Sequence, residues 1–235
     1  MFLLAALFGA ITIACVLMIP ADSIDDRKAR GVKEDDPESQ PSGLTVLLKH
    51  KPLLVLGLAL AIFHLGNAAL VPLYGMSATS DGKANGPGFV ATIVVIAQGV
   101  MVVTSIVGMR VAEKRNYWLL LLISFLMLPL RGIVAFFFTG WWGVVPVEIL
   151  DGIAIGLQGV AVPGMVARSL YGTGRVNLAQ GAVITIQGAG AAISPAFGGW
   201  IAQWAGFSPT FLVLGGLGLL AAGVWVVLSA AVKEY

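Results

Sequence analysis

Seven long apolar runs dominate this 235-residue sequence and restrict the folds that are open to it. Each run carries few or no charges and has roughly the 17–25 residues that a helix needs to cross a hydrocarbon core of about 30 Å. The runs are continuous rather than alternating, which excludes the strands of a membrane β-barrel. The sequence therefore predicts an all-α polytopic membrane protein with seven transmembrane helices: Phe2–Pro20, Pro52–Tyr74, Phe89–Met109, Tyr117–Phe138, Val144–Ala167, Val176–Trp204 and Pro209–Val232.

The composition supports this class and excludes several others. Hydrophobic residues make up 58% of the chain and charged residues 11%, against about 45–50% and about 25% in soluble domains. The single cysteine, Cys15, can form neither an internal disulfide nor a multi-thiolate metal site. Neither a P-loop nor an H-E-x-x-H or G-x-S-x-G motif is present. We therefore expect a lipid bilayer as the surroundings, and no enzymatic activity, metal, cofactor or nucleic-acid partner.

The basic residues predict the orientation. Segment 21–51 carries six lysines and arginines, further ones occupy the third-to-fourth and fifth-to-sixth connections and the C-terminal tail, and the alternate connections hold only Lys83. Because cytoplasmic loops carry the excess of lysine and arginine, we predict that the C-terminus is cytoplasmic and that Met1 lies outside. No basic residue precedes the first run, which favours a membrane helix over a cleaved signal peptide.

Charge patterning also predicts the domain organisation. Segment 21–51 mixes acidic and basic residues and contains the linker-like stretch Pro37–Gly43. The sequence therefore predicts a lone transmembrane helix over residues 1–20, a cytoplasmic loop over 21–51 and a six-helix bundle over 52–235.

Four ionisable side chains lie inside the predicted spans, namely His64, Arg131, Glu148 and Asp151. Such groups at bilayer depth cost at least about 2.5–3.5 kcal/mol, so each is a functional candidate. Arg131 and Glu148 fall at nearly the same depth in consecutive spans at ~1.5 Å per residue, and Glu148 and Asp151 share one helix face. Two interpretations stay open. The charges form a structural pair of Arg131 with Glu148, or one carboxylate, preferably Asp151, faces a cavity and carries a proton.

Polar residues in two other spans extend this candidate site. His64 lies near the middle of its span, and is either a neutral interhelical hydrogen-bonding group or a proton carrier. Asn67 shares its face one turn later, and Gln187 belongs to a polar stripe in the sixth span. We predict that Asn67 and Gln187 contact a solute, whereas the isolated amide of Gln158 is expected to bond between helices.

Three stretches resemble motifs of the major facilitator superfamily. Residues 189–199, with Gly190, Ser194, Pro195, Gly198 and Gly199, resemble the G-x-x-x-G-P-x-x-G-G motif of the antiporters, with Ser194 at the second glycine.

The other two stretches lie in predicted connections. Met109–Asn116, with Arg110 and Glu113, is similar to the cytoplasmic G-R-x-A-D-R-x-G-R-[RK] turn, although Tyr117 and Trp118 replace its last basic pair. Ile19–Gly31 is similar to the start of the loop that joins the two halves of a twelve-helix transporter.

The resemblance implies a function. The chain would be the last helix of the N-terminal half followed by the C-terminal half of a secondary active transporter, working by alternating access on a small solute or ion. In the family, the helices that match those of His64 and Asp151 line the central cavity, so either residue would carry a coupling proton. The plasma membrane is the implied location, and a missing N-terminal half or a second copy is the implied partner.

Two alternatives remain. The chain could be an inactive fragment or an accessory half-transporter, because a cavity needs walls from both halves. A seven-helix receptor has the same topology, but the acid-arginine-aromatic signature at the inner end of the third span is missing, as is a lysine in the last span.

Overall fold

The computed structural model describes residues 2–20, 25, 30–32, 50–80, 87–114 and 117–228. These residues form helices and no strands, which confirms the all-α class. The helices are α1 (Phe2–Leu17), α4 (Lys51–Asn67), α5 (Leu70–Ser80), α6 (Pro87–Lys114), α7 (Tyr117–Phe137), α8 (Trp141–Ser169), α9 (Val176–Ala205) and α10 (Phe207–Val227).

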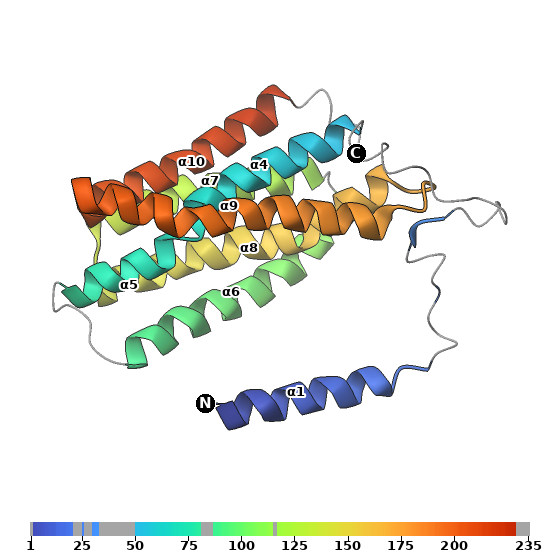
Figure 1. Ribbon diagram of the computed structural model, residues 1–235, viewed down its shortest axis with the longest axis horizontal. Coiled ribbons are helices and arrows are strands. Elements are labelled where there is room, and N and C mark those ends of the chain that lie inside the picture. Colours follow the sequence, from blue (N-terminus) through green and yellow to red (C-terminus); the bar gives the residue numbers. More distant parts are fainter. Residues whose placement is uncertain are drawn as a thin grey trace.

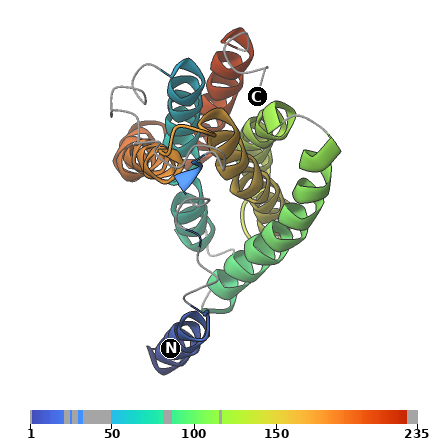
Figure 2. The same ribbon diagram turned by 90° about the vertical axis from the view of Figure 1, so that its right-hand side faces the viewer.

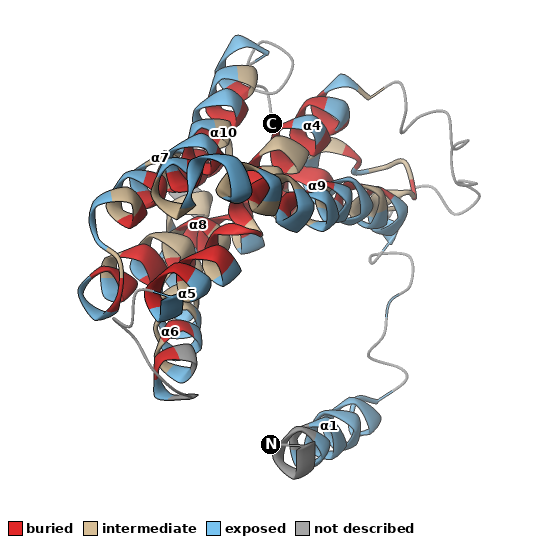
Figure 3. Ribbon diagram, turned by 60° about the vertical axis from the view of Figure 1, so that its left-hand side comes forward, coloured by how far each residue is buried: buried red, intermediate tan, exposed pale blue. Residues whose placement is uncertain are grey.

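Six segments of the described residues are long and apolar enough to cross a membrane, with α4 and α5 together forming one of them. The prediction of a polytopic membrane protein is confirmed, but the predicted seventh span is not found among the six. Helix α1 has 16 residues, which is about 24 Å at 1.5 Å per residue and falls short of a hydrocarbon core. It lies apart from the other helices in Figure 1, and its described side chains are exposed in Figure 3.

The remaining helices pack side by side into one bundle (Figure 2). Helix α8 lies between α6 and α7, α10 packs on both α7 and α4, and α9 packs mainly on α4. Glycines bring some of these pairs into backbone contact, as small residues do in lipid. A Cβ on Gly132 of α7, for example, would lie 2.9 Å from the Cα of Gly215 on α10.

The second span, predicted over Pro52–Tyr74, is found over Lys51–Ser80, and it is a broken helix rather than a single one. Helix α4 ends at Asn67 and α5 begins at Leu70. At the break, the backbone N–H of Ala69 donates to the Oγ of Ser194 at 2.8 Å, in a buried hydrogen bond to α9. The side chain of another helix thus satisfies a group that the break leaves without a helical partner, as a membrane interior requires.

Candidate functional site

A buried arginine joins three helices at the centre of the candidate site. Arg131 on α7 is 1% exposed. Its Nη1 donates to Oδ1 of Asp151 on α8 at 2.6 Å and to Oδ1 of Asn67 on α4 at 2.7 Å. Its Nη2 lies 3.6 Å from Oε1 of Glu148, one turn earlier on α8. The structure therefore brings together four of the residues that the sequence singled out.

The two carboxylates differ in their surroundings. Glu148 is 1% exposed, whereas Asp151 is 15% exposed. Within the described part of the chain, neither carboxylate oxygen of Glu148 accepts a hydrogen bond. A buried carboxylate without hydrogen-bond donors is unfavourable when it is ionised. Since one guanidinium faces two carboxyl groups, this cluster can hold one added proton and still keep an ion pair.

A second set of hydrogen-bonded polar side chains begins at His64, one turn before Asn67. The Nε2 of His64 on α4 lies 3.2 Å from Oε1 of Gln158 on α8, and the Nε2 of Gln158 donates to Oγ of Ser124 on α7 at 2.8 Å. Because an amide oxygen only accepts, the Nε2 of His64 is the donor in this contact. The expected interhelical bonding of Gln158 is confirmed, whereas Ser124 was missed because a serine in an apolar run carries no distinctive signal.

A cavity of about 250 Å³ lies beside these hydrogen-bonded side chains, between α4, α8 and α9. Of the predicted site residues, His64 and Gln187 line it, while Asn67 and Asp151 are not among its lining residues. The amide oxygen of Asn67 accepts from Arg131 instead. The described lining is apolar apart from the imidazole and three amides, and consists of His64, Ile155, Gln158, Gly159, Val162, Pro163, Gln180, Ile184 and Gln187.

The motif residues of α9 divide between two faces. Gly190, Ser194 and Gly198 recur every fourth residue and meet α4 and α5. A Cβ on Gly190 would collide with the carbonyl of Ala61, and one on Gly198 would lie 2.9 Å from Leu73. Pro195, in contrast, is exposed within a helix that continues unbroken to Ala205.

The three remaining residues predicted from the family motifs are Gly199 on α9 and Arg110 and Glu113 on α6. A Cβ on Gly199 would meet nothing within 4 Å. Arg110 is exposed near the end of α6, and the side chain of Glu113 lies outside what the structure describes.

Tyr74 is a further residue that sequence analysis did not single out. It sits on α5, is fully buried, and its hydroxyl lies 3.0 Å from the carbonyl oxygen of Phe138 and 2.9 Å from that of Gly140. Both carbonyls belong to the turn between α7 and α8, so the second half of the broken span is tied to the hairpin that carries the charge cluster. A tyrosine at the expected end of a span suggests an interfacial anchor rather than a buried contact.

These features define a polytopic integral membrane protein whose interior holds charged and amide side chains beside a broken helix. The chain is 36% identical over 219 residues to two curated proteins, one from each of two strains of Mycobacterium tuberculosis, and each is named an uncharacterized MFS-type transporter. The match covers 92% of this chain and 52% of each relative, so the chain spans about half the length of the curated relatives it matches. No family model matches the chain. On this similarity the chain belongs to the major facilitator superfamily, consistent with its being a C-terminal half.

Proposed function

We propose that the protein is one half of a secondary active transporter that moves a small solute by alternating access. The observation that carries this proposal is the ion cluster of Arg131, Asp151 and Glu148, buried among membrane-spanning helices that also enclose a cavity lined by His64 and three glutamine side chains. Charged side chains at this depth mark ion and solute pathways, and transporter sites lie at mid-membrane next to broken helices.

The cluster suggests how a proton gradient would be coupled to transport. Asp151 is the more exposed carboxylate and binds Nη1 of Arg131 directly, while Glu148 lies 3.6 Å from Nη2. A proton that binds to Asp151 removes the charge of that carboxylate and so weakens its ion pair with Arg131, the guanidinium that also binds Asn67 of α4. His64 lines the cavity and lies one helical turn before Asn67, which binds Arg131, so it is the residue that would link proton binding to the solute site.

A second six-helix unit would complete the cavity. Only 22% of an 18-residue apolar stretch of the α9 span is buried inside the bundle, against 44–61% for the spans of α4 and α5, α7, α8 and α10. The outward side of α9 carries Asn177 and Thr185, which are both exposed. Polar side chains favour contact with protein or water over lipid, so we infer that this face meets the other half of the transporter or a second copy. The excess of lysine and arginine in the alternate connections supports a cytoplasmic C-terminus, and the family suggests the plasma membrane.

A chimera tests the proposal. The chain replaces the aligned half of one Mycobacterium tuberculosis relative, and the purified protein is reconstituted into vesicles that contain the pH dye pyranine. Sugars, amino acids and organic cations are added in turn, and lumenal pH is recorded with and without an uncoupler. We expect a solute that moves protons in the wild-type chimera, and loss of this coupling in the Asp151→Asn and His64→Gln double variant.

The matched control is Thr79→Ala on α5, since this exposed hydroxyl donates, among the described residues, to carbonyls of its own helix. It should leave coupling unchanged. If the double variant transports the solute with equal sensitivity to the uncoupler, the proton assignment is wrong. If the relative transports a solute and the chimera transports none, the chain is not a competent half.

A further inference from the structure

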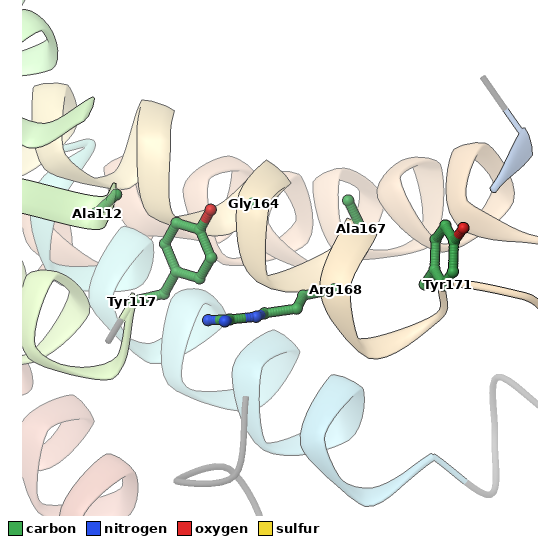
Figure 4. A pocket seen from close by; sticks show the side chains of 6 residues that line it. All are labelled: Ala112, Tyr117, Gly164, Ala167, Arg168 and Tyr171. Carbon is green, nitrogen blue, oxygen red and sulfur yellow. The ribbon is translucent and has the colours of Figure 1, made fainter. Parts of the chain in front are cut away.

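A second, more open pocket lies at the end of the bundle where α6 and α8 finish and α7 begins (Figure 4). Its volume is about 620 Å³. Pro163 lines the cavity described above, whereas the next residue, Gly164, lines this pocket, so the two sites use different faces of α8. The described lining comes from α6, α7, α8 and the turn after α8, and consists of Ala112, Tyr117, Gly164, Ala167, Arg168 and Tyr171.

The arginine in this pocket is held by an aromatic ring. The Cζ of Arg168 lies over the ring of Tyr117, 5.9 Å from its centroid, which is within reach of a cation–π interaction. A Cβ on Gly164 would fall 2.5 Å from Cζ of that ring. The glycine therefore lets the tyrosine lie directly against α8, and the ring in turn positions the guanidinium beside the pocket, as Figure 4 shows.

The surroundings of the pocket change from polar to apolar along the helices. Its lining offers a guanidinium and two phenol groups, which are hydrogen-bond donors. Beside it on α6, Met109 is 52% exposed and Ile106 is 46% exposed, one and two turns before Ala112. The pocket thus combines hydrogen-bond donors at the end of a span with an exposed apolar surface along the adjoining helix. This combination matches an amphiphile that has an anionic head and an acyl tail.

We propose that this pocket binds the phosphate group of an anionic phospholipid, with Arg168 as its main contact and the acyl chains lying along α6. Arginine suits this role because its planar donors match the oxygens of a phosphate. A free phosphate ion would use the same donors but would gain nothing from the exposed side chains of Ile106 and Met109. This assignment is independent of the transport proposal, because neither the buried ion cluster nor the 250 Å³ cavity takes part in it.

Lipid-dependent stabilisation of the purified full-length chain tests the assignment. Dioleoyl phosphatidylglycerol or dioleoyl phosphatidylcholine is titrated into the protein in dodecyl maltoside, and thermal unfolding is followed by tryptophan fluorescence. We expect tighter apparent binding of phosphatidylglycerol. In Arg168→Gln this affinity should fall about fivefold, the factor that corresponds to ~1 kcal/mol for one basic residue at a membrane surface.

Two further variants distinguish binding in the pocket from a general effect of positive charge and from misfolding of the variant. Arg110→Gln removes an exposed arginine of the same end that is not among the described lining residues, and should change the affinity less than twofold. Ala167→Leu keeps Arg168 but fills the pocket, and should weaken phosphatidylglycerol binding even if Arg168→Gln proves too unstable to purify.

Three results would overturn the proposal. In the first, both phospholipids stabilise the wild-type chain equally. In the second, Ala167→Leu and any soluble Arg168→Gln retain the preference for phosphatidylglycerol. In the third, inorganic phosphate or glycerol 3-phosphate stabilises the chain as well as the lipid does and competes with it, which would assign the pocket to a soluble anion.

Discussion

Replacing Ser194 by alanine should destabilise the bundle through a single lost acceptor. In the structure the hydroxyl of Ser194 accepts the N–H of Ala69 at the break between α4 and α5, and the side chain is fully buried. Ser194→Ala removes the acceptor, creates almost no cavity and leaves the donor buried. The variant therefore isolates the energy of one hydrogen bond at the helix break.

The expected magnitude follows from the burial of the donor. An unsatisfied buried backbone group costs about 1–3 kcal/mol, and the absence of water from a bilayer core favours the upper end of that range. The unfolding equilibrium constant should rise roughly 5- to 150-fold. Thr185→Ala is the matched control, because within the part of the chain that the structure describes this exposed hydroxyl donates to a carbonyl of its own helix, that of Gly181. Its effect should stay within about 0.5 kcal/mol.

Both variants can be measured by titrating dodecyl sulfate into mixed micelles and following tryptophan fluorescence, since Trp225 is fully buried. Hydrogen exchange supplies a local readout: the amide of Ala69 should be protected in the wild-type chain and should exchange faster in Ser194→Ala. If Ser194→Ala and Thr185→Ala destabilise the chain equally, or if the amide of Ala69 exchanges at the same rate in both, the role assigned to this hydrogen bond is refuted.

Three other predictions concern packing, charge and pH. Gly190→Leu should destabilise by at least about 1–3 kcal/mol, because its side chain would meet the backbone of Ala61, while Gly188→Leu, in open space, should melt near the wild-type temperature. Arg131→Met should lose about 3–5 kcal/mol in the same dodecyl sulfate assay by leaving two carboxyl groups without their cation, and neutralising both of them as well should restore part of the loss. Burial lowers the pKa of His50, just outside the second span, below its ordinary 6.5. The unfolded chain then binds more protons there, so stability should fall as pH drops below about 6.5, and His50→Gln should flatten that slope.

The ion cluster was only partly predictable from the sequence. Counting residues along two consecutive spans predicted that Arg131 and Glu148 share a depth, because helical rise is constant. The closer partner is Asp151, at 2.6 Å, and Asn67 of α4 supplies a second acceptor at 2.7 Å. Depth alone does not tell which carboxylate points at the arginine, since that depends on how each helix is rotated about its own axis.

The motif on α9 also shows that the sequence does not predict which groups meet between helices. The sequence revealed Ser194 as a departure from the family's glycine, but its hydrogen-bond partner lies 125 residues away along the chain. The break at Ala68 and Ala69 has a local signal in Pro72, because a proline has no N–H to donate to the carbonyl four residues earlier and its ring crowds that carbonyl. Only the partner of the Ala69 N–H could not be predicted locally, because the accepting hydroxyl comes from another helix.

The sequence by itself determined the class of protein, the approximate position of each bundle span and the set of side chains that a bilayer makes costly to bury. These properties depend on hydrophobic length and on helical rise, which are local. Tertiary packing alone decided which hydroxyl accepts the Ala69 N–H at the break in the second span, that one guanidinium bridges three helices, and that Arg168 and Tyr117 line one pocket. Each of these results depends on how helices far apart in the chain are rotated and how closely they approach. A shift by the width of one side chain changes which groups meet.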